Sequence, residues 1–253
     1  MSDWVFLRGL TRESAHWGDF PARFESALPG ARVHLIDLPG NGLRCAERSP
    51  ATVADMVADA RAQLQRLGIT TPVHLLALSL GAMVATQWLH SAPQDIASAV
   101  LVNTSMRPFS PLHHRMRMHN LPTLLRLVFG SPSSEEAERL IWRMTSRQAT
   151  VDEAVLARWI AARLQHPVQA VNALRQLLAA ARFRAPAGLP QRPVLLLTSR
   201  GDRLVSNRCS EALAQAWGCA LALHPDAGHD LPLDDPDWVI AQVRPWVERL
   251  QPG

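Results

Sequence analysis

Residues 73–83 read VHLLALSLGAM, and this stretch decides the fold. Its first six residues form an unbroken apolar run, which is typical of a strand buried on both faces. Ser79 interrupts the run, and the residues after it have the apolar spacing of a helix. A tight corner between a strand and a helix projects a serine side chain away from its neighbours, provided that the residues two before and two after it are small. Here these residues are Ala77 and Gly81.

Ser79 is therefore a candidate nucleophile, although a serine in the wall of the core is the alternative. A hydroxyl becomes a good nucleophile only when a base removes its proton. A helix that begins at Leu80 would direct free main-chain N–H groups toward negative charge that develops nearby. The pattern small-x-Ser-x-Gly is weak by itself. Its context favours the nucleophile, because the other Ser-x-Gly, at residues 199–201, has bulky Leu197 two positions before its serine.

Similar apolar runs recur along the chain, and helical patterns separate several of them. Residues 52–67 have apolar 3–4 spacing and a glycine stop, and residues 80–90, 209–217 and 237–250 are also helical in pattern. Strands that alternate with helices predict an α/β protein with a mostly parallel central sheet flanked by helices. The six predicted strands are residues 4–7, 33–38, 73–78, 99–102, 194–198 and 220–223.

The alternation breaks once, after Val102. Roughly ninety residues pass before the next predicted strand, and they contain helix-period segments at 134–144, 151–165 and 168–183. A loop of that length without structure would be improbable in a compact domain. We therefore predict a helical cap over residues 104–190, inserted into an α/β core that consists of residues 1–103 and 191–253.

A nucleophilic serine needs a base and a group that orients the base. His229 lies in PDAGHD, residues 225–230, after the last predicted strand. Ligands bind at the carboxyl ends of the strands in an open α/β sheet, so this loop should lie at the same edge as Ser79. His224, at the end of that strand, is the rival base. Asp202, in the loop after residues 194–198, could hold the imidazole, with a turn aspartate or helix N-cap as the alternative.

Five short motifs in the same order resemble those of the α/β-hydrolase superfamily, over nearly the whole chain. The segment ALSLG resembles the nucleophile elbow, DLPGNG the D-x-P-G-x-G loop, GDRLV the acid loop and AGH the histidine loop. RGL, followed by Trp17, resembles the H-G-x segment that supplies an oxyanion donor. The five motifs occupy residues 77–81, 37–42, 201–205, 227–229 and 8–10.

The resemblance implies a role for each matching residue. Ser79 would be the nucleophile, His229 the base and Asp202 the group that orients it, in the chain order of this family. The main-chain N–H groups of Leu10 and Leu80 would form the oxyanion hole. Four residues depart from the family pattern: Ala77 and Ser199 stand in place of glycines, Thr11 where a second glycine is common, and Arg8 in place of histidine.

The function that the resemblance implies is hydrolysis of a carboxylic ester by a serine hydrolase through an acyl-enzyme. The elbow and the cap are similar to those of small bacterial carboxylesterases, including pimeloyl-acyl-carrier-protein methyl ester esterases. Two alternatives remain: an esterase or thioesterase that acts on acyl groups held by an acidic carrier protein, and a catalytically inactive binding protein on the same scaffold. The candidate substrate contacts are Trp17 at the catalytic end and three cap residues, Phe109, Leu112 and Trp142, for which burial in the core of the cap is the favoured alternative.

Composition limits the partners. All 26 basic residues are arginines, and residues 104–190 hold 12 of them against 5 acidic residues, a net charge of +7 that could face an acidic carrier protein. No compact polybasic tail indicates nucleic-acid binding. No apolar stretch is long enough to predict a membrane span, and MSDWVFLRGL does not resemble a signal peptide. Three widely spaced cysteines predict free thiols in the cytoplasm, and no pattern predicts a metal or another cofactor.

Overall fold

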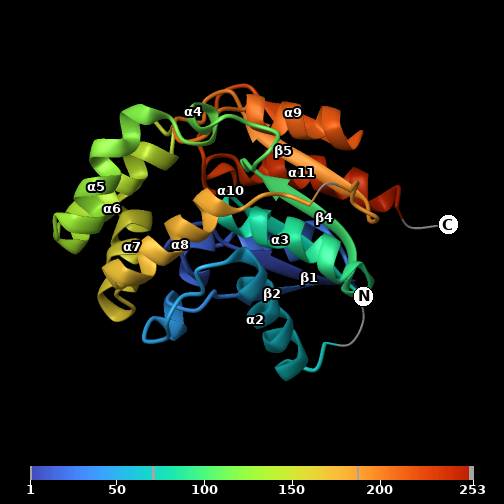
Figure 1. Ribbon diagram of the computed structural model, residues 1–253, viewed down its shortest axis with the longest axis horizontal. Coiled ribbons are helices and arrows are strands. Elements are labelled where there is room, and N and C mark those ends of the chain that lie inside the picture. The colour runs from blue at the N-terminus through green and yellow to red at the C-terminus, as the bar shows by residue number, and fades with distance from the viewer. Residues whose placement is uncertain (1, 70–71, 187, 251–253) are drawn as a thin grey trace.

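Six parallel strands form one central sheet in the order β2-β1-β3-β4-β5-β6 (Figure 1). The computed structural model describes residues 2–69, 72–186 and 188–250. The strands are β1 (Ser2–Leu7), β2 (Ala31–Ile36), β3 (Val73–Leu78), β4 (Ile96–Val102), β5 (Val194–Ser199) and β6 (Ala220–His224). All six predicted strands are confirmed, because continuous apolar runs suit strands that helices cover on both faces.

Two apolar cores lie on the two faces of the sheet. Val5 and Leu7 of β1 point into the core that contains α2 (Val53–Arg66), α3 (Leu80–Ser91) and α9 (Arg208–Trp217). Trp4 and Phe6 point to the other face, where α1 (Phe20–Ala27) and α11 (Pro236–Glu248) pack. This alternation follows from the two-residue period of a strand. The predicted α/β fold is therefore confirmed, including the helices at 52–67, 80–90, 209–217 and 237–250.

The chain between β4 and β5 is mostly helical. We call α4 (Leu112–Arg115), α5 (Leu121–Phe129), α6 (Ser134–Thr145), α7 (Glu153–Gln165) and α8 (Ala170–Arg182) the insertion helices. Figure 1 shows α5, α6 and α7 beyond one end of the sheet, with α8 leading back toward it. Three of them match the predicted segments 134–144, 151–165 and 168–183. The short helices elsewhere are η1 (Ser14–Trp17), η2 (Gly42–Arg44), η3 (Pro93–Asp95), η4 (Met118–Asn120) and α10 (Leu231–Asp234).

The strand order reverses between β1 and β3. The chain leaves β1 toward β2 on one side and leaves β3 toward β4 on the other. Loops diverge at such a point and leave a crevice at the carboxyl ends of the strands, where ligands bind in this class of fold. Ser79 and the loop that begins at Arg8 border this crevice.

In the described residues no helix is long and apolar enough to cross a membrane, and the three cysteines are unpaired.

Candidate active site

Ser79 occupies a strained corner between β3 and α3. Its φ is 56° and its ψ is −114°, a backbone conformation that residues other than glycine rarely adopt. A hydrogen bond of 3.0 Å from its amide to the carbonyl of Val102 holds the corner. A Cβ atom on Gly81 would lie 2.5 Å from the carbonyl oxygen of Leu7, so only glycine fits there. Ala77 is fully buried in β3.

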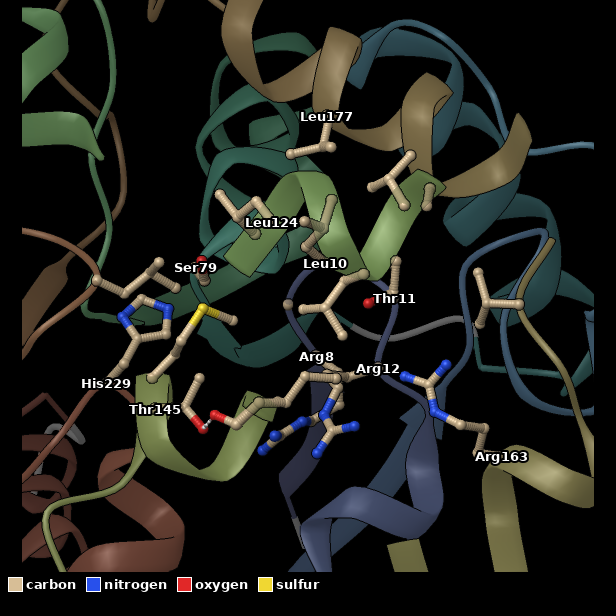
Figure 2. Close-up of a pocket in the computed structure, with 18 of the residues that line it drawn as sticks. Arg8, Leu10, Thr11, Arg12, Ser79, Leu124, Thr145, Arg163, Leu177 and His229 are labelled. Carbon is tan, nitrogen blue, oxygen red and sulfur yellow. Dashed lines mark hydrogen bonds between the residues drawn. The ribbon is translucent and has the colours of Figure 1, made fainter. Parts of the chain in front are cut away.

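His229 and Asp202 meet in a buried pair, although 27 residues separate them in the chain. The imidazole Nδ1 and the Asp202 Oδ2 atom are 2.7 Å apart. The other oxygen, Oδ1, accepts hydrogen bonds from the amides of Leu204 and Val205, at 2.7 and 2.9 Å. An ionised carboxylate only accepts, so Nδ1 is the donor in this pair, and in a neutral imidazole Nε2 is then the acceptor. Figure 2 shows the imidazole at the pocket, beside Ser79.

Asn103 supports the end of β5 and the histidine loop, a role that no sequence motif indicates. Its side-chain Nδ2 donates to the carbonyls of Gly228 and His229, at 3.1 and 2.8 Å. Its Oδ1 accepts from the hydroxyl of Thr198 and the amide of Ser199, at 3.2 and 3.1 Å. The residue follows β4 directly and has a φ of 44°, which asparagine tolerates better than most residues. Asn103 thus fixes the end of β5 against the histidine loop.

His224, the rival base, has a structural role. Its Nδ1 accepts hydrogen bonds from the amides of Asp226 and Ala227, at 3.0 and 2.7 Å, so it shapes the loop that carries His229. Its Nε2 lies 3.1 Å from a carboxylate oxygen of Asp235. Both ring nitrogens of His224 are therefore engaged away from Ser79.

Arg8 forms a buried ion pair with Asp230, the residue that follows His229. Its Nη1 and Nη2 atoms donate to the two oxygens of the carboxylate, and both side chains are only 4% exposed. The guanidinium lies over the ring of Trp17, 4.6 Å from the ring centroid. A planar guanidinium suits this stacked, bidentate arrangement better than an ammonium would. Arg8, the departure from the family pattern, thus joins the loop after β1 to the histidine loop.

The loop after β1 packs closely against Ser79. A Cβ atom on Gly9 would lie 3.1 Å from the Ser79 Cβ atom. Thr11 has a φ of 54°, a marked outlier for a β-branched residue, and its amide donates to the Gln176 side chain at 2.8 Å. Among the described residues, the amides of Leu10 and Leu80 donate to no protein acceptor.

Ser79 and His229 line one cavity of about 320 Å³ between the sheet edge and the insertion helices. This size is within the range of small-molecule sites. Apolar side chains, including Leu10, Leu124 and Leu177, line one part of it (Figure 2). Three arginines line another part: Arg8, Arg12 and Arg163.

The four side chains expected to contact substrate lie elsewhere. Trp17 belongs to an aromatic cluster of the core, under α1. Phe109 packs edge-on against Trp217, and Trp142 is buried among the insertion helices. Leu112 is 62% exposed. The sequence shows that these four residues are apolar, but its periodicity does not give the direction of each side chain. In the described residues, no three His, Cys, Asp or Glu side chains group as metal ligands would.

The sequence profile of the alpha/beta hydrolase family matches residues 4–242. The chain belongs to this family. The match covers all six strands apart from the first residues of β1, together with the elbow and both loops of the candidate site. The predicted family membership is therefore confirmed, and this alpha/beta hydrolase can be compared with its relatives.

Two curated relatives are pimeloyl-[acyl-carrier protein] methyl ester esterases. The protein of Chromobacterium violaceum is 36% identical over 105 residues, which are 42% of this chain and 38% of the relative. That of Pectobacterium carotovorum subsp. carotovorum is 27% identical over 249 residues, 96% and 92% of the two chains. Among solved structures, a thermophilic esterase from Thermogutta terrifontis superposes with a TM-score of 0.78 at 21% identity, covering 100% of this chain and 91% of that one. The family match and the curated relatives support an enzyme of the hydrolase and esterase type, and the solved structure supports the fold.

Proposed function

We propose that this alpha/beta hydrolase is a serine esterase that cleaves a carboxylic ester through an acyl-enzyme. One observation carries the proposal: His229 is hydrogen-bonded to buried Asp202 and lines the same cavity as Ser79. A serine, a neutral imidazole and a carboxylate in this relation make up the apparatus of nucleophilic acyl transfer. In this proposal residues 104–190, which include the insertion helices, act as the cap that covers the site.

Each residue has a defined part in the proposed reaction. Ser79 attacks the ester carbonyl while Nε2 of His229 takes the hydroxyl proton. The amides of Leu10 and Leu80 donate to the oxyanion of the tetrahedral intermediate. The imidazolium then gives its proton to the leaving alcohol, and the acyl group stays on Ser79. Water, deprotonated by His229, attacks the acyl-enzyme and releases the acid.

Covalent labelling tests the nucleophile directly. A fluorophosphonate probe should label the wild-type protein and not the Ser79→Ala variant. His229→Ala should slow both labelling and hydrolysis of short nitrophenyl esters by on the order of 10³-fold or more. His90→Ala, at an exposed histidine near the end of α3, is the matched control and should behave as wild type. Labelling that persists in Ser79→Ala would refute the assignment, and an unreactive wild type without turnover would favour the inactive binding protein.

A second candidate substrate is an acyl group on an acidic carrier protein. Residues 104–190 carry a net charge of +7, and their five acidic residues all have local partners. Glu135, Glu136, Glu138 and Glu153 pair with arginines, and Asp152 caps α7. Exposed arginines such as Arg143 and Arg158 therefore face solvent with their charge available. The two curated relatives act on a substrate of this kind.

Salt dependence distinguishes the two substrates. Docking through exposed arginines should give carrier-linked esters a higher kcat/KM than free methyl esters at low salt, and this advantage should shrink as salt screens the charges. The double variant Arg143→Gln/Arg158→Gln should reduce the advantage without changing hydrolysis of free esters. Equal hydrolysis of both forms at every salt concentration would exclude the carrier protein.

A further inference from the structure

The cavity that contains Ser79 also has a cationic side. Arg8, Arg12 and Arg163 all contribute to its lining, and Figure 2 shows Arg163 on the side away from Ser79 and His229, with Arg8 and Arg12 between. Two carboxylates neutralise them: Asp230 pairs with Arg8, and Glu138 pairs with the other two. Three guanidinium groups therefore share two directly bonded carboxylates.

Arg12 is buried without satisfying all of its donors. It is 7% exposed, its Nη1 donates to Oε2 of Glu138 at 2.6 Å, and its guanidinium lies 4.1 Å from the centroid of the Trp159 ring. Its Nη2 is buried and has no hydrogen-bond partner among the described residues. A buried, unpaired N–H donor costs free energy, and a charged one costs more. Burial lowers the pKa of Arg12, although Glu138 opposes this shift, so the protein alone compensates the charge incompletely.

Arg163 is held beside Arg12 by the same carboxylate. Its Nε donates to Oε1 of Glu138 at 2.6 Å, while Arg12 binds Oε2. Glu138 itself is 1% exposed. Arg163 uses Nε for this contact, and Figure 2 shows the end of its guanidinium directed toward the pocket. One buried carboxylate thus places two guanidinium groups side by side in the cavity wall.

We propose that Arg12 and Arg163 form a carboxylate subsite, and that the preferred substrates are monoesters of dicarboxylic acids. The inference rests on the proposed esterase function and specifies its substrate class. The free carboxylate binds the two guanidinium groups while the ester carbonyl lies at Ser79. A guanidinium fork matches the geometry of a carboxylate. The apolar wall between the two ends accommodates the methylene chain.

Paired substrates test the subsite. Monomethyl esters of dicarboxylic acids, from malonate to suberate, would each be compared with the uncharged methyl ester of a fatty acid of the same length. At the chain length that spans the cavity, wild-type kcat/KM should favour the anionic ester by roughly ten- to 100-fold, the worth of hydrogen bonds between charged groups. Arg163→Gln is the preferred variant because Arg163 is only partly buried, so its replacement should disturb the fold little. In this variant the ratio of kcat/KM for the anionic ester to kcat/KM for the neutral ester should fall toward one. Arg139→Gln, which removes an equal charge from the exposed surface, should keep the ratio.

Binding gives a readout that does not depend on turnover. Calorimetry with Ser79→Ala should show the anionic ester binding roughly tenfold or more tightly than its neutral counterpart, and Ser79→Ala/Arg163→Gln should lose this difference. An active wild-type enzyme that treats both esters alike at every length would overturn the subsite and leave the esterase function intact. A protein with no turnover and an unreactive Ser79 would fail as an esterase, and calorimetry would still decide the subsite.

Discussion

The carboxylate of Asp230 accepts hydrogen bonds from Nη1 and Nη2 of Arg8, and both side chains are almost completely buried. Asp230 follows His229, whereas Arg8 lies at the end of β1, so this pair joins the proposed oxyanion loop to the loop of the proposed base. Removal of one partner leaves a buried charge uncompensated, which costs more than removal of both.

We therefore expect Arg8→Met to lower the free energy of unfolding by about 3 kcal/mol or more and to reduce kcat. The double variant Arg8→Met/Asp230→Asn should recover a substantial part of the stability. Urea denaturation and steady-state kinetics on the two variants measure both effects. A double variant that is no more stable than Arg8→Met would show that the two side chains are not energetically coupled.

The two small residues that flank Ser79 should respond differently to one methyl group. In Gly81→Ala the new Cβ atom would meet the carbonyls of Leu7 and Arg8 at 2.5 and 2.7 Å, so the corner must move. A displacement of about 1 Å at a nucleophile costs on the order of 100-fold in rate. Ala77→Gly, the matched change, restores the family pattern and should cost only about 1 kcal/mol of stability, with kcat preserved. Equal losses of kcat in the two variants would contradict this account of the elbow.

Asn103 offers a way to separate backbone strain from hydrogen bonding. Asn103→Gly keeps the positive φ accessible but removes the hydrogen bonds to the β5 end and the histidine loop, whereas Asn103→Ala removes both. We expect Asn103→Gly to lose about 2 kcal/mol of stability and to lower kcat more than it raises KM. Asn103→Ala should be less stable than Asn103→Gly, because alanine does not tolerate the positive φ. Denaturation and kinetics together test the order, and wild-type kcat in Asn103→Gly would exclude a positioning role.

His16 makes the stability depend on pH. Its Nδ1 accepts from the amide of Glu13 at 3.0 Å, and burial, reinforced by Arg12, lowers the pKa of His16 well below its usual value. The unfolded chain takes up a proton below about pH 6.5 that the folded protein does not, so stability falls as the pH falls through this range. Between about pH 7 and about pH 5.5 the wild type should lose about 1 kcal/mol more than His16→Gln. Parallel stability–pH curves would show that His16 is not responsible.

The sheet and its covering helices could be predicted from sequence because burial on both faces leaves a direct record in the order of residues. Strand β3 is an unbroken apolar run, and its length and position were predicted to the residue. The loops after β3, β5 and β6 carry Ser79, Asp202 and His229, and parallel topology brings those loops to one edge. In the structure a hydrogen bond joins Asp202 to His229, and Ser79 lines the same cavity as His229.

The chemistry of the cavity wall could not be predicted in the same way. Trp17 and Trp142 were candidate substrate contacts, but both are buried in packing contacts, which for Trp142 was the favoured alternative. Arg8 and Arg12 stand four residues apart in a loop of irregular backbone, where no helical or strand period gives the direction of a side chain. Their partners, Asp230 and Glu138, are 222 and 126 residues away in sequence. Only the folded chain reveals those pairings.

Glu138 has a consequence beyond the charge of the cavity. It lies on α6, and its two oxygens bind Arg12 from the loop after β1 and Arg163 from α7. One contact between the insertion helices and the core therefore passes through the wall of the cavity itself. A ligand that binds both guanidinium groups forms a second bridge between the loop after β1 and α7. Its binding free energy therefore also stabilises the contact between the core and the insertion helices. By the same linkage, any mutation that weakens the packing of the insertion helices on the core should lower the affinity for the ligand, even at a position that the ligand does not contact.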